Sequence, residues 1–140
     1  MVLEKLKLTG KTILITGAGT GLGREMALAL SNAGANLVIA ARREKLINEV
    51  CEIIKERGNR AIAIPADLTD SKQVENLVQS GLDQFKSIDV LINNAGINAD
   101  NLSLRMKEEE WKKVIDINLS STFLLTKNAI KKMLKTKYGR

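Results

Sequence analysis

The sequence contains few of the side chains that carry covalent or metal chemistry. Among its 140 residues there is no histidine, one cysteine and one tyrosine. A single cysteine excludes an internal disulfide. Cys51 follows Ile47 and Val50 on one helix face, where a small buried side chain is expected. We therefore expect neither disulfide nor zinc chemistry, and this cysteine usage fits a cytoplasmic protein.

Long apolar runs are also absent. None approaches the roughly 18 residues that a membrane-spanning helix needs. Residues 1–9 alternate Lys and Glu with Leu, which is unlike a secretory signal. The sequence thus predicts no membrane partner.

The net charge of +6 arises entirely near the end of the chain, because basic and acidic residues balance up to Asp116. The excess is either a solvated helix end that complements the helix dipole or a docking surface for an acidic partner. No aromatic residues are interleaved to stack on bases, so a nucleic-acid partner is disfavoured. The basic side chains beyond Asp116 are Lys127, Lys131, Lys132, Lys135, Lys137 and Arg140.

Strand and helix patterns alternate along the whole chain, which predicts a single α/β domain over residues 1–140. Parallel strands joined by right-handed crossovers give a Rossmann-like, doubly wound sheet of order 3-2-1-4 with helices on both faces. Gly34 and Gly58 are expected just past helix ends, and Asp70 is expected to cap a helix. The predicted strands are 12–16, 36–41, 60–64 and 89–93, and the predicted helices are 22–33, 43–57, 71–85 and about 107–136.

A glycine-rich turn lies between the first predicted strand and helix. Backbone N–H groups and the positive end of a helix dipole converge there, and the missing Cβ atoms let phosphates approach closely. This arrangement predicts a pyrophosphate site, although a glycine turn without a ligand has the same composition. The residues concerned are Gly17, Gly19, Thr20, Gly21, Leu22 and Gly23.

A second motif, Asn93-Asn94-Ala95-Gly96, ends the fourth predicted strand. Together, Thr16-Gly-x3-Gly-x-Gly and this motif resemble the short-chain dehydrogenase/reductase family. The resemblance implies an oxidoreductase with a nicotinamide cofactor, and it implies that Asn94, Ala95 and Gly96 lie beside that cofactor. It also implies that Thr16 hydrogen-bonds across to the turn after the fourth strand.

The second predicted strand ends in Arg42 and Arg43, where NAD-binding sites usually carry an acidic residue. A guanidinium suits a phosphate, so we expect NADP(H), with Arg42 the better candidate for the 2′-phosphate. The alternative is that both arginines are solvated and balanced by Glu44. The resemblance further implies an adenine contact at Asp67, followed by Leu68, although Asp67 is equally suited to capping its own loop.

Asn118 is the one candidate catalytic residue in the sequence. In the resembling family an asparagine at this place bends the helix and holds a water in the proton relay. A solvent-facing Asn118 is the alternative. The neighbouring Ile115, Ile117 and Leu119 predict instead that its amide is buried.

The family's catalytic Ser and Tyr-x3-Lys cannot be placed in this sequence. Only Gly139 and Arg140 follow Tyr138, the sole tyrosine. The resemblance covers the first half to three-fifths of a family member, and Lys137 to Arg140 resemble the lead-in to a fifth strand. We therefore expect a domain truncated before strand five, inactive alone, with an unpaired edge on the fourth strand.

Residues 98–107 resemble the corresponding segment of the family's 3-oxoacyl-[acyl-carrier-protein] reductases. That implies reduction of a carrier-bound 3-oxoacyl thioester in fatty acid biosynthesis, with the acidic carrier docking at Lys131, Lys135 and Lys137 near the active-site rim. The broad apolar stripe of helix 107–136 predicts a contact with another subunit. The resemblance implies that this helix builds the interface of a homodimer or homotetramer. Three alternatives remain open: a dehydrogenase of a small polyol, sugar or other alcohol, a catalytically inactive nucleotide-binding module, and a gene fragment without a stable fold.

Overall fold

The computed structural model describes residues 2–140 and contains one parallel sheet. Its strands are β1 (Thr12–Thr16), β2 (Asn36–Ala41), β3 (Ala61–Pro65) and β4 (Val90–Ile92). They are arranged in the order β3-β2-β1-β4, and every neighbouring pair is parallel. The predicted fold class and strand order are confirmed. The first two strands have the predicted bounds, the third is shifted by one residue, and the fourth is shorter than expected.

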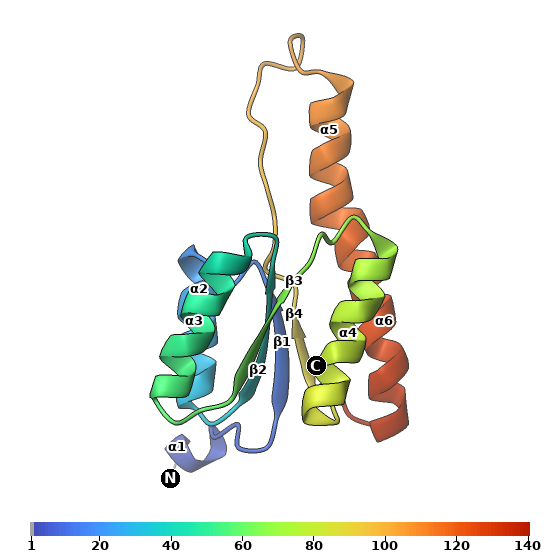
Figure 1. Cartoon of the computed structure of the whole chain (residues 1–140). Coiled ribbons are helices and arrows are strands. Elements are labelled where there is room, and N and C mark those ends of the chain that lie inside the picture. The colour runs from blue at the N-terminus through green and yellow to red at the C-terminus, as the bar shows by residue number, and fades with distance from the viewer. Residues whose placement is uncertain (1) are drawn as a thin grey trace.

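Helices cover both faces of the sheet (Figure 1). On one face α2 (Gly21–Asn32) and α3 (Glu44–Glu56) pack on Ile13, Ile15, Leu37 and Ile39. On the other, α4 (Ser71–Phe85) and α6 (Ser121–Thr136) pack on Leu14, Val38 and Ala40. Successive residues of a strand point to opposite faces, so β1 and β2 contribute to both cores. A short helix, α1 (Val2–Lys5), precedes the sheet and was not predicted.

The predicted caps at three helix ends are confirmed, and the bounds of α2 and α3 lie within one residue of those predicted. Asp70 caps α4, because its carboxylate accepts hydrogen bonds from the backbone N–H groups of Lys72 and Gln73. Gly34 and Gly58 adopt φ of +98° and +80° just past α2 and α3, in the left-handed region that glycine enters without a Cβ penalty. These caps fix where each helix turns back toward the next strand.

The helix predicted over 107–136 is interrupted. It consists of α5 (Glu108–Ile115), a π-helical turn η1 (Asp116–Ser120) and α6. The backbone N–H of Ser121 donates to the Asp116 carbonyl, five residues earlier, which is the bond of a π turn, and the Ser121 hydroxyl donates to the same carbonyl at 2.7 Å. Figure 1 shows α5 standing beyond the strand ends, beside the extended segment that follows β4. The π turn contains Asn118, the position at which the resemblance implied a bend in this helix.

The outer edge of β4 is partly paired, which corrects the expected unpaired edge. The N–H of Arg140 donates to the carbonyl of Asp89 at 3.0 Å, and the N–H of Leu91 donates to the carbonyl of Arg140 at 3.0 Å. Arg140 therefore lies along this edge and runs in the same direction as β4. Within residues 2–140, no helix combines the length and the apolar character needed to cross a bilayer.

Candidate functional site

A cleft of about 490 Å³ opens at the carboxyl ends of the strands. In open α/β sheets, ligands bind at this edge. The cleft brings together most of the residues predicted to hold a cofactor, although they come from four separate segments of the chain. Those residues are Gly17, Gly19, Thr20, Arg42, Arg43, Asp67, Leu68, Asn94, Ala95 and Gly96.

The turn after β1 packs tightly against the turn after β4. Gly17 adopts φ +65°, and a Cβ at this position would lie 2.9 Å from the Cα of Ala95. A Cβ at Gly23 would meet the carbonyl oxygen of Gly17, and it would lie 2.5 Å from Nδ2 of Asn94. Both positions therefore need glycine for the two turns to meet.

Gly21, Leu22 and Gly23 do not line the cleft. Leu22 is 79% exposed, and a Cβ at Gly21 would face open space, although its φ of +55° still favours glycine. These three residues begin α2 instead. Thr20, the N-cap residue, makes no side-chain cap, and the first turn of α2 contains no acidic side chain. The N-terminus of α2 therefore keeps unneutralised N–H groups, as an anion site requires.

Thr16 and Asn94 connect the two turns. The Thr16 hydroxyl oxygen accepts hydrogen bonds from the N–H groups of Asn94 at 3.2 Å and Ala95 at 3.0 Å. In return, Nδ2 of Asn94 donates to the carbonyls of Thr16 at 3.0 Å and Gly17 at 3.1 Å. The predicted contact from Thr16 across to the strand-four turn is confirmed. The Asn94 side chain is thereby used to hold the walls of the cleft in place.

The charged end of the cleft combines two arginines with one carboxylate. Asp67 accepts hydrogen bonds from the hydroxyl of Thr69 at 2.7 Å and from its N–H at 2.9 Å. These bonds, with a smaller contribution from the charge of Arg42, lower the pKa of Asp67, so the carboxylate is ionised at neutral pH. Asp67 caps its own loop and also lines the cleft. Within residues 2–140, neither Arg42 nor Arg43 forms an ion pair.

Asn118 is exposed, so the predicted burial of its amide was wrong. Both polar atoms of the amide nevertheless bond to the segment after β4: Oδ1 accepts from the N–H of Ile97 at 2.8 Å, and Nδ2 donates to the Ile97 carbonyl at 2.7 Å. Asn118 lies in the π turn η1, where the helix phase changes and the flanking apolar residues do not enclose it. Asn118 therefore connects η1 to Ile97, which lines the cleft.

Several lining residues were not identified from the sequence. Ala41 is the last residue of β2 and Ala66 directly follows β3, and their place in the strand–helix pattern could have suggested them. Leu46 and Ile117 reach the cleft from helices, and Ile97 reaches it from an extended segment. No local pattern marks these three, because tertiary packing alone brings them together. The additional lining residues are Ala41, Leu46, Ala66, Ile97 and Ile117.

The lysines proposed to dock an acidic partner do not lie at this cleft. Lys131, Lys135 and Lys137 are exposed, but α6 runs opposite to the strands and carries them to the end where the strands begin (Figure 1). Lys137 instead lines a second groove beside Leu91. The expected position near the active-site rim is therefore corrected. Within residues 2–140, no group of His, Cys, Asp or Glu side chains could hold a metal ion.

Comparisons with known proteins agree with this geometry. The sequence profile described as short chain dehydrogenase matches residues 11–140. A 3-oxoacyl-[acyl-carrier-protein] reductase of Synechocystis sp. is 45% identical over 134 residues, which cover 95% of this chain and 54% of that protein. A reductase of the same name, FabG, from Staphylococcus aureus is 43% identical over 136 residues, covering 96% of this chain and 54% of that protein.

Solved structures give the same result. A short-chain type dehydrogenase/reductase from Mycobacterium marinum superposes with a TM-score of 0.92 at 34% identity. The superposition covers 97% of this chain and 56% of that one. The chain thus spans about half the length of the curated relatives and of the solved structure that it matches.

Proposed function

Because the chain belongs to the short chain dehydrogenase family, we propose that it is the cofactor-binding part of an NADPH-dependent carbonyl reductase. The substrate class is a 3-oxoacyl-[acyl-carrier-protein] thioester, whose ketone is reduced to an alcohol in fatty acid biosynthesis, in the cytoplasm. The names of the relatives support this substrate. The observation that carries the proposal is the cleft in which a glycine turn, an uncapped helix N-terminus and two arginines meet.

The residues of the cleft fit a dinucleotide. Gly17, Gly19 and Thr20 line the cleft, and Thr20 directly precedes the uncapped N-terminus of α2, so this wall binds the pyrophosphate. Gly21, Leu22 and Gly23 are the first three residues of α2, which follows this wall. Asn94, Ala95 and Gly96 form the opposite wall, on the nicotinamide side. When bound, the nicotinamide cofactor supplies the hydride.

Two arginines at the other end of the cleft favour the phosphorylated cofactor. Arg42 and Arg43 line the cleft at the carboxyl end of β2, and the guanidinium fork of Arg42 binds the 2′-phosphate. Arg43 adds positive charge as the N-cap residue of α3. Asp67 and Leu68, after β3, contact the adenine. The structure holds the Asp67 carboxylate in its loop through Thr69, which leaves its outer surface for that contact.

Titration calorimetry with NADPH and NADH tests the cofactor assignment without requiring turnover. Replacing Arg42 by Asp is expected to weaken NADPH binding by about tenfold or more, because a charge-assisted hydrogen bond contributes about 1.5–3 kcal/mol. The affinity of this variant for NADH should stay the same or increase. Lys45→Asp is the matched control, since it makes the same charge change on the exposed surface of α3, outside the cleft. Equal NADPH affinity in the wild-type protein and Arg42→Asp would contradict the assignment.

Asn118 is the proposed catalytic residue of this part of the enzyme. Its amide holds Ile97 beside the nicotinamide wall, and a lone pair of Oδ1 is left to orient a water molecule for proton transfer. The sequence contains no Tyr-x3-Lys, so we expect the 140-residue chain alone to bind NADPH without oxidising it. Measurable reduction of a 3-oxoacyl thioester by the chain alone would contradict this division of roles.

We infer two kinds of protein partner from the exposed surfaces of the chain. The apolar side chains of α5, η1 and α6 form a surface for a homodimer or homotetramer, with Trp111, Leu119 and Phe123 each more than half exposed. The acyl carrier protein is the proposed acidic partner, attracted by Lys131, Lys135 and Lys137. Because these lysines lie far from the cleft, they would steer the encounter rather than position the thioester. Charge reversal at all three should slow association with the carrier protein and leave NADPH affinity unchanged.

A further inference from the structure

Cations gather at the end of the molecule where the strands begin, opposite the cofactor cleft. α3, α4 and α6 run opposite to the strands, so their last residues reach this end together with the residues that precede β1 and β3 (Figure 1). The cations are dispersed along the sequence, and the fold alone brings them together. We call this set the basal face, and it consists of Lys11, Arg57, Arg60, Lys86, Lys135 and Lys137.

The basal face carries an excess of positive charge. Its six cations are opposed at this end by two exposed carboxylates, Glu56 and Asp83. Lys7 and Lys55 lie at the same end, but each pairs with a glutamate three residues earlier. Asp89 is buried, and its carboxylate accepts hydrogen bonds from a backbone N–H and a hydroxyl. Within residues 2–140, none of the six cations forms an ion pair, so their charge faces the solvent.

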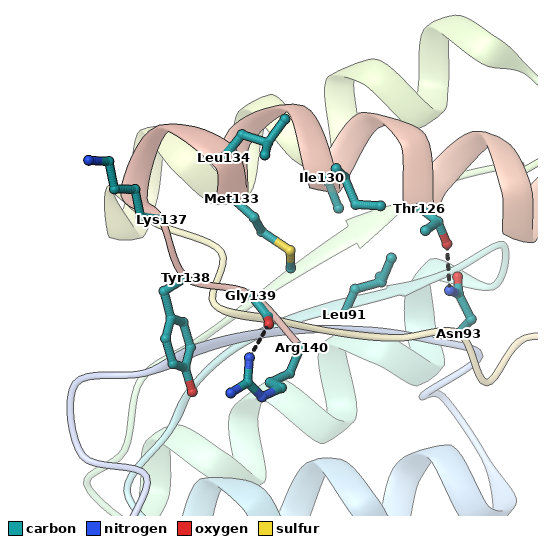
Figure 2. A pocket seen from close by; sticks show the side chains of 11 residues that line it. Leu91, Asn93, Thr126, Ile130, Met133, Leu134, Lys137, Tyr138, Gly139 and Arg140 are labelled. Carbon is teal, nitrogen blue, oxygen red and sulfur yellow. Dashed lines mark hydrogen bonds between the residues drawn. The ribbon is translucent and has the colours of Figure 1, made fainter.

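Aromatic rings hold two of these cations in place. The guanidinium of Arg60 lies 5.0 Å from the ring centroid of Phe85, and the ammonium of Lys11 lies 3.7 Å from that of Tyr138. The first two residues of β2 donate to the carbonyls of Lys11 at 2.8 Å and Arg60 at 3.0 Å, so both cations flank the start of this strand. Figure 2 shows the side chain of Lys137 directed away from the second groove. A ring attracts a cation without neutralising it, so the positive charge is retained.

An exposed apolar side chain lies beside the basal face. Leu6 is 62% exposed, between the exposed Lys5 and Lys7. This segment is attached to the same end of the molecule, because the N–H of Leu8 donates to the carbonyl of Ala33, just past α2, at 2.8 Å. Basic side chains around a protruding leucine are typical of surfaces that enter the headgroup region of an anionic bilayer. A nucleic-acid backbone would give the cations partners but would leave Leu6 without one.

We propose that the basal face binds the surface of an anionic phospholipid bilayer. Its six cations contact headgroup phosphates, and Leu6 enters the boundary between headgroups and acyl chains. The sequence predicted no membrane partner because it lacks a spanning segment, which a contact at the bilayer surface does not need. The cofactor cleft lies at the opposite end of the sheet and stays open to water. The inference is independent of the proposed function, since no residue of the cleft takes part.

Co-sedimentation of the 140-residue chain with extruded vesicles tests this proposal. The chain should bind vesicles of phosphatidylglycerol and phosphatidylcholine, should not bind phosphatidylcholine alone, and should dissociate at high salt, because the attraction is electrostatic. Arg57→Glu combined with Lys135→Glu should weaken binding about tenfold or more, since both exposed side chains would then repel the headgroups. Leu6→Ser should weaken it about threefold or more, by removing an apolar contact without changing charge.

The matched control reverses one lysine on each of the same two helices, nearer the helix start. Lys45→Glu combined with Lys127→Glu changes the net charge equally, and both side chains are exposed. Its affinity for the vesicles should stay within about threefold of the wild-type value, because salt screens charges beyond roughly 10 Å from the contact. Equal losses in the two double variants would overturn the proposal, since net charge alone would then govern binding.

Tryptophan fluorescence identifies the face that meets the bilayer. Trp111 is the only tryptophan, and it lies 61% exposed on α5, beyond the opposite ends of the strands. Brominated phosphatidylcholine in the vesicles should leave the emission of Trp111 unquenched, whereas Leu6→Trp should add an emission that is quenched. The proposal is overturned if anionic vesicles do not bind, if Trp111 is quenched, or if a short DNA duplex binds more tightly than the vesicles and so identifies a nucleic-acid partner.

Discussion

β1 and β4 have nearly the same sequence character but very different surroundings. Ile13-Leu14-Ile15 and Val90-Leu91-Ile92 are apolar runs that pair with one another in register. Every residue of β1 is buried, whereas all three residues of β4 are only partly buried. The difference is position: β1 has a strand on each side, and β4 has one strand and an open groove. An apolar run therefore predicts a strand, while the neighbours of that strand decide how much of it is buried.

The same contrast extends to the helices. α2, α3 and α4 each bury four residues against the sheet. α5 and η1 bury none, although α5 is strongly amphipathic. α6, beside β4, also buries four residues, so the break in burial lies at α5 and η1. The exposed apolar side chains of α5 and η1 are therefore available for contacts with other chains. Four experiments test or sharpen this comparison.

The largest effect is expected from one pair of substitutions. Leu14 and Leu91 are partners in the β1–β4 register, and Leu14 is fully buried while Leu91 is not. Leu14→Ala should lower the free energy of unfolding by about 2–5 kcal/mol, and Leu91→Ala by less than about half of that, because less apolar area returns to water. Urea unfolding of both variants measures the difference. Equal losses would show that the edge strand is packed as tightly as the central one.

A second experiment tests the junction of the two strands. Gly23→Ala should destabilise the protein by about 1–3 kcal/mol and weaken NADPH binding, since its Cβ would push apart the turns after β1 and β4. Gly21→Ala places its Cβ in open space, so only the strain of φ +55° remains, about 1 kcal/mol. Thermal unfolding and calorimetry report both effects. If Gly21→Ala impairs NADPH binding more than Gly23→Ala, the junction does not shape the cleft.

The third experiment compares the two ends of β1. Thr16→Val removes the hydroxyl that accepts from Asn94 and Ala95, leaving N–H groups unpaired at a cost of about 1–2 kcal/mol. Thr12 is equally buried, but its hydroxyl has no hydrogen-bond partner within residues 2–140, so Thr12→Val should be neutral or stabilising. Measuring the free energy of unfolding of both variants tests this expectation. A larger loss at Thr12 would contradict the assignment of Thr16 as the connection to β4.

The effect that is smallest at neutral pH concerns Cys51, which is buried in α3. Burial raises the pKa of its thiol from 9.0 to about 11. Between these values the unfolded chain releases the proton while the folded chain retains it, so the free energy of unfolding should fall as pH rises from 9 toward 11. A thiol reagent at neutral pH should react with Cys51 only on unfolding. Rapid reaction of the native protein would show that this layer opens easily.

The sequence predicted the features that local chemistry determines. Strands 12–16 and 36–41 and helix 71–85 have the observed bounds, because apolar runs, Asp70 and the glycines at helix ends mark them. Most of the residues expected around the cofactor meet in one cleft, since parallel strands bring their carboxyl ends to one edge. The contact from Thr16 to the strand-four turn joins residues 78 and 79 positions apart, and the family resemblance predicted it correctly.

The remaining features depend on contacts between distant segments. The π turn inserts one residue into a helix whose apolar spacing otherwise suits a continuous one, and the pairing of Asn118 with Ile97 spans 21 residues. The exposure of Asn118 and the placement of Leu46 and Ile117 follow from packing. The position of Lys131, Lys135 and Lys137 follows from the direction of α6 relative to the sheet. None of these relations has a signature within a window of neighbouring residues.

The strand order also has a consequence for how the chain folds. β1 pairs with β2 across a short separation, Thr12 to Asn36, but the hydrogen bond from Thr12 to Asp89 closes a separation of 77 residues. Closing the longer loop costs about 1 kcal/mol more in chain entropy, and it requires three further elements to be made first. During synthesis, β1, β2 and β3 can therefore assemble while the future β4 side of β1 is still bare. The central strand of the finished protein is an edge strand while it is being made, and it depends on the prompt arrival of β4 to avoid pairing with other nascent chains.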